Sequence, residues 1–139
     1  MTASRTVGNG ATMPIMSVRL KSAFNRATLI PLAFDSMTTS NQSYLAQLVV
    51  GGTLTGAVFA PTTGAATEFD VSATVITGGT VIASALSSAA GSRTAGETLA
   101  GELVAAANIA GTTDIVSLVV VALTGNTTCF GELSWKEIY

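Results

Sequence analysis

The chain has 139 residues, of which 48% are apolar and only 10% are charged, against about 25% charged in an average soluble protein. This length suits one domain with a single core. Six basic and eight acidic residues give a formal net charge of −2, so the sequence offers no basic patch for nucleic acid, and we expect a largely neutral surface.

The first thirteen residues, MTASRTVGNGATM, are mostly polar and show no clear period. We therefore expect residues 1–13 to form an extended N-terminal arm whose order depends on a partner, and residues 14–139 to form the domain. No apolar stretch follows a basic start, so we expect no secretory signal and folding in a cytoplasm. The longest apolar run, LVVVAL at 118–123, is far shorter than the roughly 20 residues that span a bilayer, and we expect no membrane partner.

Alternating and apolar runs predict strands along the first half of the domain. Residues 16–21, MSVRLK, alternate between apolar and polar, which is typical of a half-buried strand. Residues 27–35, ATLIPLAFD, form an extended apolar run in which Pro31 predicts an edge strand or a bulge. Residues 43–50 predict the next strand, followed by a short strand around 54–59 and a Pro-Thr-Thr-Gly turn at 61–64.

The tripeptide Gly-Gly-Thr occurs at 51–53 and again at 78–80. Neither copy is followed by the lysine of a Walker phosphate loop, and each lies between two strand-like runs, whereas a dinucleotide site needs its glycines between a strand and a helix. We interpret both as corners in which glycine supplies a positive φ and threonine starts the next strand. Residues 68–84, EFDVSATVITGGTVIAS, are accordingly predicted to be a hairpin.

The second half is less regular until its end. Residues 85–113 are rich in Ala, Gly and Ser, and we predict a loop with one strand near 102–107, a short helix being the alternative. Residues 114–123, a turn at 124–127 and residues 128–139 predict a final hairpin. On its last strand, alternation places one set of residues on one face (Cys129, Gly131, Leu133 and Trp135) and another on the opposite face (Glu132, Ser134 and Lys136).

About eight short strands separated by turn residues predict an all-β fold, an antiparallel β-sandwich of jelly-roll type. We expect a single core that includes Leu48, Val50, Val71, Val81, Leu118, Val120, Leu133 and Trp135.

Little in the sequence points to catalysis, because the chain contains no histidine and so lacks His-based triads, general bases and most zinc sites. Two acid pairs resemble the carboxylates of a glycosidase, Glu68 with Asp70 and Glu132 with Glu137. Acids scattered at strand ends are more typical of solvated turns, so we assign no catalytic residue. The single cysteine, Cys129, excludes an intramolecular disulfide and is predicted to be buried in a strand.

Residue types in the sequence suggest two kinds of binding site. Asp35, Asp70 and Asp114 are possible calcium ligands, but no Asp-rich loop gathers them, and no metal or cofactor is assigned. Trp135, Tyr44 and Tyr139 are possible sugar-stacking residues, although a lone tryptophan in an alternating strand favours core packing.

Four ordered segments resemble a domain of virion structural proteins from tailed bacteriophages: MSVRLKSAFNRATLIPLAFD, GGTLTGAVFA, EFDVSATVITGGTVIAS and GELSWKEIY. The resemblance covers residues 16–139. It implies a non-enzymatic particle component located in the virion, and in the host cytoplasm during assembly, whose partners are the major capsid protein or other virion proteins.

A chain that is nearly all domain suits a free-standing accessory protein, so we expect a capsid decoration protein. Because its strands are apolar and carry little charge, we expect a homo-oligomer, a trimer, that covers exposed edges and faces. The alternative is a tail, neck or fibre component that binds a receptor or carbohydrate through Trp135, Tyr44 or the loop at 87–98.

Overall fold

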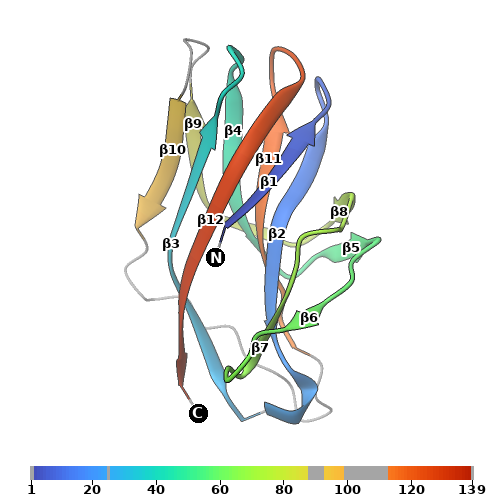
Figure 1. Cartoon of the computed structure of the whole chain (residues 1–139), viewed down its shortest axis with the longest axis vertical. Helices are drawn as coiled ribbons and strands as arrows, with labels where there is room; N and C mark the ends of the chain where they lie inside the picture. Colours follow the sequence, from blue (N-terminus) through green and yellow to red (C-terminus); the bar gives the residue numbers. More distant parts are fainter. Residues whose placement is uncertain (1, 25, 88–92, 99–112, 139) are drawn as a thin grey trace.

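Strands make up almost all of the regular structure in the computed structural model, which describes residues 2–24, 26–87, 93–98 and 113–138 (Figure 1). The only described helical element is the 3-10 turn η1 (Ser22–Phe24). The strands are β1 (Thr2–Val7), β2 (Thr12–Leu20), β3 (Thr28–Thr38), β4 (Tyr44–Val50), β5 (Thr53–Thr55), β6 (Ala60–Pro61), β7 (Thr67–Asp70), β8 (Val75–Thr77), β9 (Thr80–Ser87), β10 (Arg93–Thr98), β11 (Val116–Ala122) and β12 (Thr127–Ile138).

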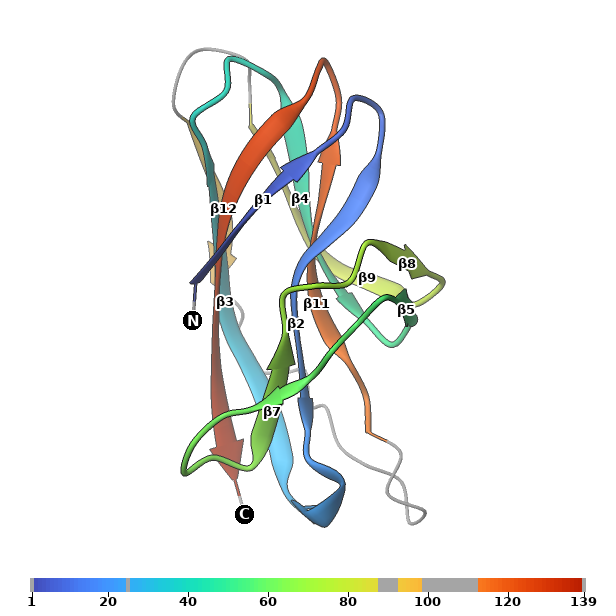
Figure 2. The ribbon, with the colours of Figure 1, turned by 45° about the vertical axis from the view of Figure 1, so that its right-hand side comes forward.

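Two antiparallel sheets form a β-sandwich, as the sequence predicted. One sheet has the order β1-β12-β3-β10 and the other the order β6-β7-β2-β11-β4-β9. The pairing is nested, because β1 pairs with β12, β2 with β11, β3 with β10 and β4 with β9. The two sheets lie face to face in both ribbon views (Figures 1 and 2).

Residues 51–79, which we call the insert, lie between β4 and β9. Within the insert, β5 and β8 pair with each other as a separate two-stranded sheet. Figure 2 shows these two strands projecting from the side of the sandwich. Between them in the sequence, β6 and β7 join the six-stranded sheet, with β7 beside β2 and β6 at the edge.

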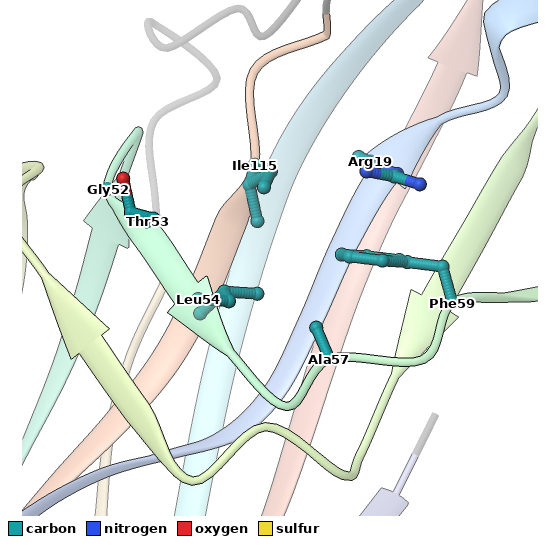
Figure 3. Close-up of a pocket in the computed structure, with 7 residues that line it drawn as sticks. All are labelled: Arg19, Gly52, Thr53, Leu54, Ala57, Phe59 and Ile115. Carbon is teal, nitrogen blue, oxygen red and sulfur yellow. The ribbon is translucent and has the colours of Figure 1, made fainter.

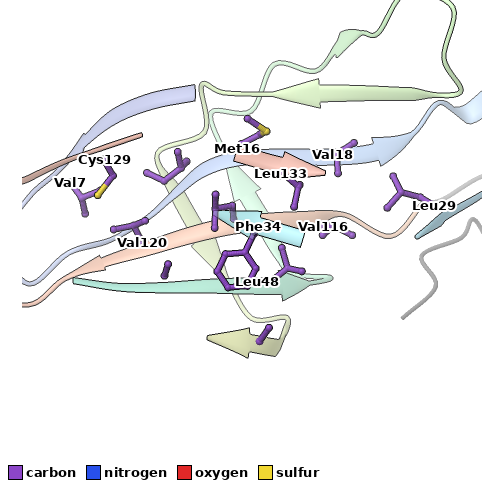
Figure 4. Close-up of a cluster of buried hydrophobic side chains, with 14 of the residues drawn as sticks. Val7, Met16, Val18, Leu29, Phe34, Leu48, Val116, Val120, Cys129 and Leu133 are labelled. Carbon is purple, nitrogen blue, oxygen red and sulfur yellow. The ribbon is translucent and has the colours of Figure 1, made fainter. Parts of the chain in front are cut away.

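Between the two sheets lies one hydrophobic core (Figure 4). Four of the predicted core residues are fully buried there: Leu48, Leu118, Val120 and Leu133. Val50 and Trp135 are partly buried and pack against this core.

Two predicted core residues are wrong: Val71 is 41% exposed and Val81 is 49% exposed. Val71 lies in the insert, away from the sheet interface. At Val81 the cause is a β-bulge, because Leu48 pairs with Ala83 and Val49 with Val81, which leaves Ile82 as the extra residue. Such a bulge shifts the alternation by one residue, and Ile82 packs against the core instead.

Most of residues 1–13 are not a separate arm, which corrects the sequence-based expectation. β1 pairs with β12 along its whole length, from Thr2 opposite Glu132 to Val7 opposite Thr127. Val7 is fully buried in the core and β2 already begins at Thr12. The period was short but present, since Ala3, Arg5 and Val7 are less exposed than their neighbours. The first strand is therefore part of the sandwich.

The prediction at Pro31 is confirmed. β12 pairs with β3 through Ser134 opposite Ala33 and Trp135 opposite Pro31, so Leu32 is the extra residue of a bulge. β10 pairs with β3 only from Ala33 to Thr38, which leaves Pro31 beyond its reach. A proline that cannot donate to a ladder is therefore accommodated.

β11 and β12 do not form the predicted final hairpin. The turn between them carries the chain from the six-stranded to the four-stranded sheet. Contacts to the β3–β4 connection stabilise this crossing: Leu123 N–H donates to Ser43 O at 3.0 Å and Thr124 Oγ1 donates to Gln42 Oε1 at 2.7 Å. The alternation predicted for β12 nevertheless holds, with Cys129 and Leu133 buried and Glu132 and Lys136 exposed.

The strand predicted near 102–107, and its helical alternative, lie outside the described residues. Within the Ala, Gly and Ser-rich residues 85–113, the structure contains the end of β9, which extends to Ser87, and β10, which the sequence analysis did not predict.

Candidate functional site

The two Gly-Gly-Thr copies lie side by side at the base of the insert. On the sandwich side of the glycines β4 pairs with β9, and on their other side β5 pairs with β8. Gly51, Gly52, Gly78 and Gly79 all have positive φ, between 71° and 84°. The predicted positive φ is therefore confirmed, but the hairpin at 68–84 is wrong: β8 pairs with β5 and β9 with β4, so the glycines bend two paired strands away from the sandwich together.

Close packing at this double bend leaves no room for a side chain at residue 79. A Cβ on Gly79 would lie 2.7 Å from Val49 Cγ1 and 3.1 Å from Val50 O. Gly51 N–H donates to Ile115 O at 2.9 Å, so this amide is used inside the protein. The repeated motif therefore shapes the backbone.

A pocket of about 480 Å³ lies beside the double bend (Figure 3). It is lined by Arg19 of β2, by Ile115 just before β11 and by five residues of the insert, namely Gly52, Thr53, Leu54, Ala57 and Phe59. The Arg19 guanidinium stacks on the Phe59 ring with 3.8 Å between Cζ and the ring centroid, and Arg19 Nε donates to Glu68 Oε1 at 2.6 Å. The cation of the pocket is already paired with both a ring and a carboxylate.

Asp70 joins two segments of the insert, one at Val58 and the other at Ser72 and Ala73. Its carboxylate accepts hydrogen bonds from Val58 N–H at 2.8 Å, Ser72 N–H at 3.0 Å and Ala73 N–H at 2.9 Å, and from the Ser72 hydroxyl. Burial alone would raise the pKa of Asp70, but these hydrogen bonds outweigh it and hold the pKa below its ordinary value. Asp70 is therefore a charged structural anchor.

Arg5 reaches from β1 to the same segment. Its guanidinium donates to Pro14 O at 3.1 Å, to Ser72 O at 3.4 Å and to Ala73 O. Three backbone carbonyl oxygens thereby receive donors from one side chain. The first strand, the second strand and the insert are joined at one side chain.

A third anchor lies at the end of β12. Glu137 accepts hydrogen bonds from Thr67 Oγ1 at 2.5 Å, Ala66 N–H at 2.9 Å and Trp135 Nε1 at 3.1 Å. Burial alone would raise the pKa of Glu137, but these donors, together with the charge of Lys21, hold the pKa below its ordinary value. Lys21 Nζ itself donates to Ala65 O at 2.7 Å and Thr62 O at 3.0 Å.

Neither acid pair considered for glycoside hydrolysis is arranged for it. Glu68 pairs with Arg19, and Asp70 is surrounded by backbone donors. Glu132 lies opposite Asp35 in the ladder of β12 and β3, whereas Glu137 binds the insert. A general acid needs a carboxyl that can be protonated near neutral pH, and the pKa shifts of Asp70 and Glu137 run the other way.

The three calcium candidates are dispersed. Asp35 lies in β3 of one sheet, Asp70 in β7 of the other, and Asp114 is exposed just before β11. Among the described residues no group of three or more His, Cys, Asp or Glu side chains could hold a metal ion.

The sugar-stacking candidates are largely occupied. Tyr44 is fully buried, and its hydroxyl donates to Ser36 O at 3.0 Å. Trp135 packs against the core and donates its indole N–H to Glu137. Tyr139 lies outside the described residues, and within 87–98 the structure describes Ser87, which is buried, and β10.

Cys129 is fully buried, as predicted, and burial raises the pKa of its thiol to about 11. A thiol that stays protonated at neutral pH is a poor nucleophile. No helix in the described part of the chain is long and apolar enough to cross a membrane.

No known family model matches the chain, and no curated protein matches it significantly. The class defined by the structure is the all-β sandwich, here with an inserted ribbon held by charged side chains.

The sequence analysis missed the charged contacts of the insert. Arg5, Arg19 and Lys21 all serve it, although only six basic residues exist in the chain. Their partners lie 41 to 68 residues away in the sequence, so no local pattern could identify them. The sequence did contain one indication: because the chain has so few charged residues, each of them is a candidate for a specific structural contact.

Proposed function

We propose that this chain is a non-enzymatic structural protein of a tailed bacteriophage particle, and that it decorates the capsid as a homo-oligomer. The ordered sequence resemblance supports this proposal. The nested pairing of β1 with β12, β2 with β11, β3 with β10 and β4 with β9 supports a sandwich of jelly-roll type.

The observation that carries the proposal is the outer face of the four-stranded sheet. Phe130 of β12 and Met37 of β3 lie directly opposite one another in the ladder and are 42% and 39% exposed. Neighbouring positions on β1 carry hydroxyls, and Thr6 Oγ1 lies 3.1 Å from Thr128 Oγ1. An exposed apolar pair beside hydroxyl-bearing side chains suits contact with another protein.

The charged groups near the insert support a structural or binding role for this region over a catalytic one. Asp70 and Glu137 accept several hydrogen bonds each and have lowered pKa values, which suits charged anchors of the backbone. Arg19 is engaged by Glu68 and Phe59. These contacts fix the part of the insert from which the projecting strands β5 and β8 extend toward a neighbouring subunit.

Decoration would work through many weak contacts. Each copy would contact the major capsid protein and its own neighbours, and repetition over the symmetric shell would add up modest single interfaces. The proposal places the protein in the virion, and in the host cytoplasm during assembly. The trimer expected from the sequence is one oligomer compatible with it.

Cryo-electron microscopy of the particle tests this role. Hundreds of copies on the head are expected. A few copies in a ring would instead place the chain in the neck, tail or baseplate, and absence from the particle would overturn the proposal. Binding of purified protein to particles that lack it, at a fixed ratio to the capsid protein, is the matching biochemical result.

A further inference from the structure

The outer face of β12 carries a pattern that reads the same in both directions when the charges are exchanged. Its outward residues are Phe130, Glu132, Ser134, Lys136 and Ile138. In order, they are apolar, acidic, neutral, basic and apolar. We infer that two copies of this chain associate through this face about a two-fold axis, with their β12 strands antiparallel.

A two-fold contact requires a surface that is complementary to itself. If the axis passes at Ser134, Glu132 of one copy faces Lys136 of the second copy, and Phe130 faces Ile138. Residues two apart on a strand are about 7 Å apart, so the charged pairs lie about 7 Å from the axis and the apolar pairs about 14 Å. Each contact occurs twice.

The charges of this face lack partners within the described part of the chain, where the one ion pair is Arg19 with Glu68. Glu132 lies directly opposite Asp35 in the ladder with β3, and like charges in that position destabilise a sheet. A lysine from a second copy, placed between the two carboxylates, would remove this repulsion. The cation that the face itself supplies for this is Lys136, which is exposed on the same strand.

Apolar contact would come from both ends of the pattern. Phe130 and Met37 form one exposed cross-strand pair, and Ile138 is 49% exposed at the other end of β12. Leu32, the extra residue of the β3 bulge, is also exposed beside β12. The four-stranded sheet is in front in Figure 1, and its β12 strand spans the length of the sandwich.

The first test is the oligomeric state of the purified full chain by sedimentation or light scattering at micromolar concentration. A dimer is expected. A monomer would overturn the inference, and so would a trimer, because a two-fold face closes on two copies. The oligomeric state is measured without the particle. The dimer inference can therefore be wrong while the proposed role in a virion is right, and the proposed role can be wrong while the dimer is right.

The second test exchanges charges. Glu132→Lys places two lysines opposite each other at both contacts, and Lys136→Glu does the same with carboxylates, so each variant alone should raise the dimer dissociation constant roughly tenfold or more. A mixture of the two variants should form heterodimers with restored affinity. Asp114→Lys is the matched control, since Asp114 is exposed away from this face and should leave the dimer unchanged.

Restored affinity in the mixture identifies this face and the antiparallel arrangement. A dimer that neither variant weakens would overturn the inference. Circular dichroism of each variant shows whether it folds; if Glu132→Lys does not fold, Ser134→Cys with a short bismaleimide cross-linker answers the same question. We expect cross-linking at Ser134→Cys and none at Ser84→Cys on β9. Cross-linking at Ser84→Cys alone would show that the dimer does not form through the face of β12. Cys129 is buried and should not react.

Discussion

Glu137 and Thr67 share a hydrogen bond of 2.5 Å that joins the last strand of the sandwich to the insert. The same carboxylate accepts from Ala66 N–H and Trp135 Nε1. Hydrogen bonds to a charged acceptor are stronger than neutral ones because the full charge polarises the donor. The end of β12 therefore fixes the insert as well as the sheet.

Replacing Glu137 by Gln should lower the free energy of unfolding by about 1–3 kcal/mol, because the charge is lost and one donor must face the amide nitrogen. Urea unfolding followed by tryptophan fluorescence measures this, since Trp135 is a direct partner. Asp114→Asn is the control at an exposed carboxylate outside this contact and should change stability by less than about 0.5 kcal/mol. Equal losses in both variants would contradict the anchoring role.

Stability should also fall in acid. The pKa values of Asp70 and Glu137 are lowered in the folded protein, so the unfolded chain binds more protons at pH values between the folded and unfolded pKa values. Their stabilisation is complete above the unfolded carboxyl pKa of about 4 and is lost as the pH falls through the lower, folded values. Thermal unfolding from neutral pH down to pH 2 should show this decline, and Asp70→Asn should flatten it.

The first strand should be needed for stability, although the sequence suggested a separate arm. Val7→Ala removes two buried methyl groups and should cost about 1–3 kcal/mol. Thr6→Ala, at the exposed neighbouring position, should cost less than about 1 kcal/mol. Unfolding in urea compares the two. A Val7→Ala variant as stable as the unchanged protein would show that β1 contributes nothing to the core.

The sequence predicted the features that depend on neighbouring residues alone, namely which side chains of a strand face the core and where proline interrupts a ladder. The inward and outward residues of β12 follow period two, and Pro31 marked a bulge because proline cannot donate to a ladder. Val81 was misplaced because a bulge at Ile82 shifts the period, and nothing in the local sequence distinguishes that bulge from a regular strand. The β11–β12 connection looked like a hairpin because a short polar turn can either reverse a chain or cross between sheets.

The candidate site was less accessible from sequence than the fold. Arg19 meets Glu68 and Phe59 only because β2 pairs with β7, a contact between segments about fifty residues apart. The glycines at 51–52 and 78–79 were correctly given positive φ. Their pairing depends on the register of β4 with β9, which is set by the whole sheet.

A side chain at Gly79 tests this close pairing of the two glycine segments. Gly79→Ala combines a positive φ of 84° with a Cβ only 2.7 Å from Val49 Cγ1 and 3.1 Å from the backbone at Gly52 N and Val50 O. The neighbouring backbone cannot move without disturbing the β4–β9 ladder. We expect a loss of about 2–4 kcal/mol, measured by urea unfolding.

Gly78→Ala provides the matched control, because Gly78 has a similar φ of 71° but open space around its Cβ position. It should lose only the cost of the backbone conformation, about 1 kcal/mol. The difference between the two variants isolates the close packing of the double bend. If both lose the same amount, the tight approach of the two glycine pairs is not what holds the insert at its angle to the sandwich.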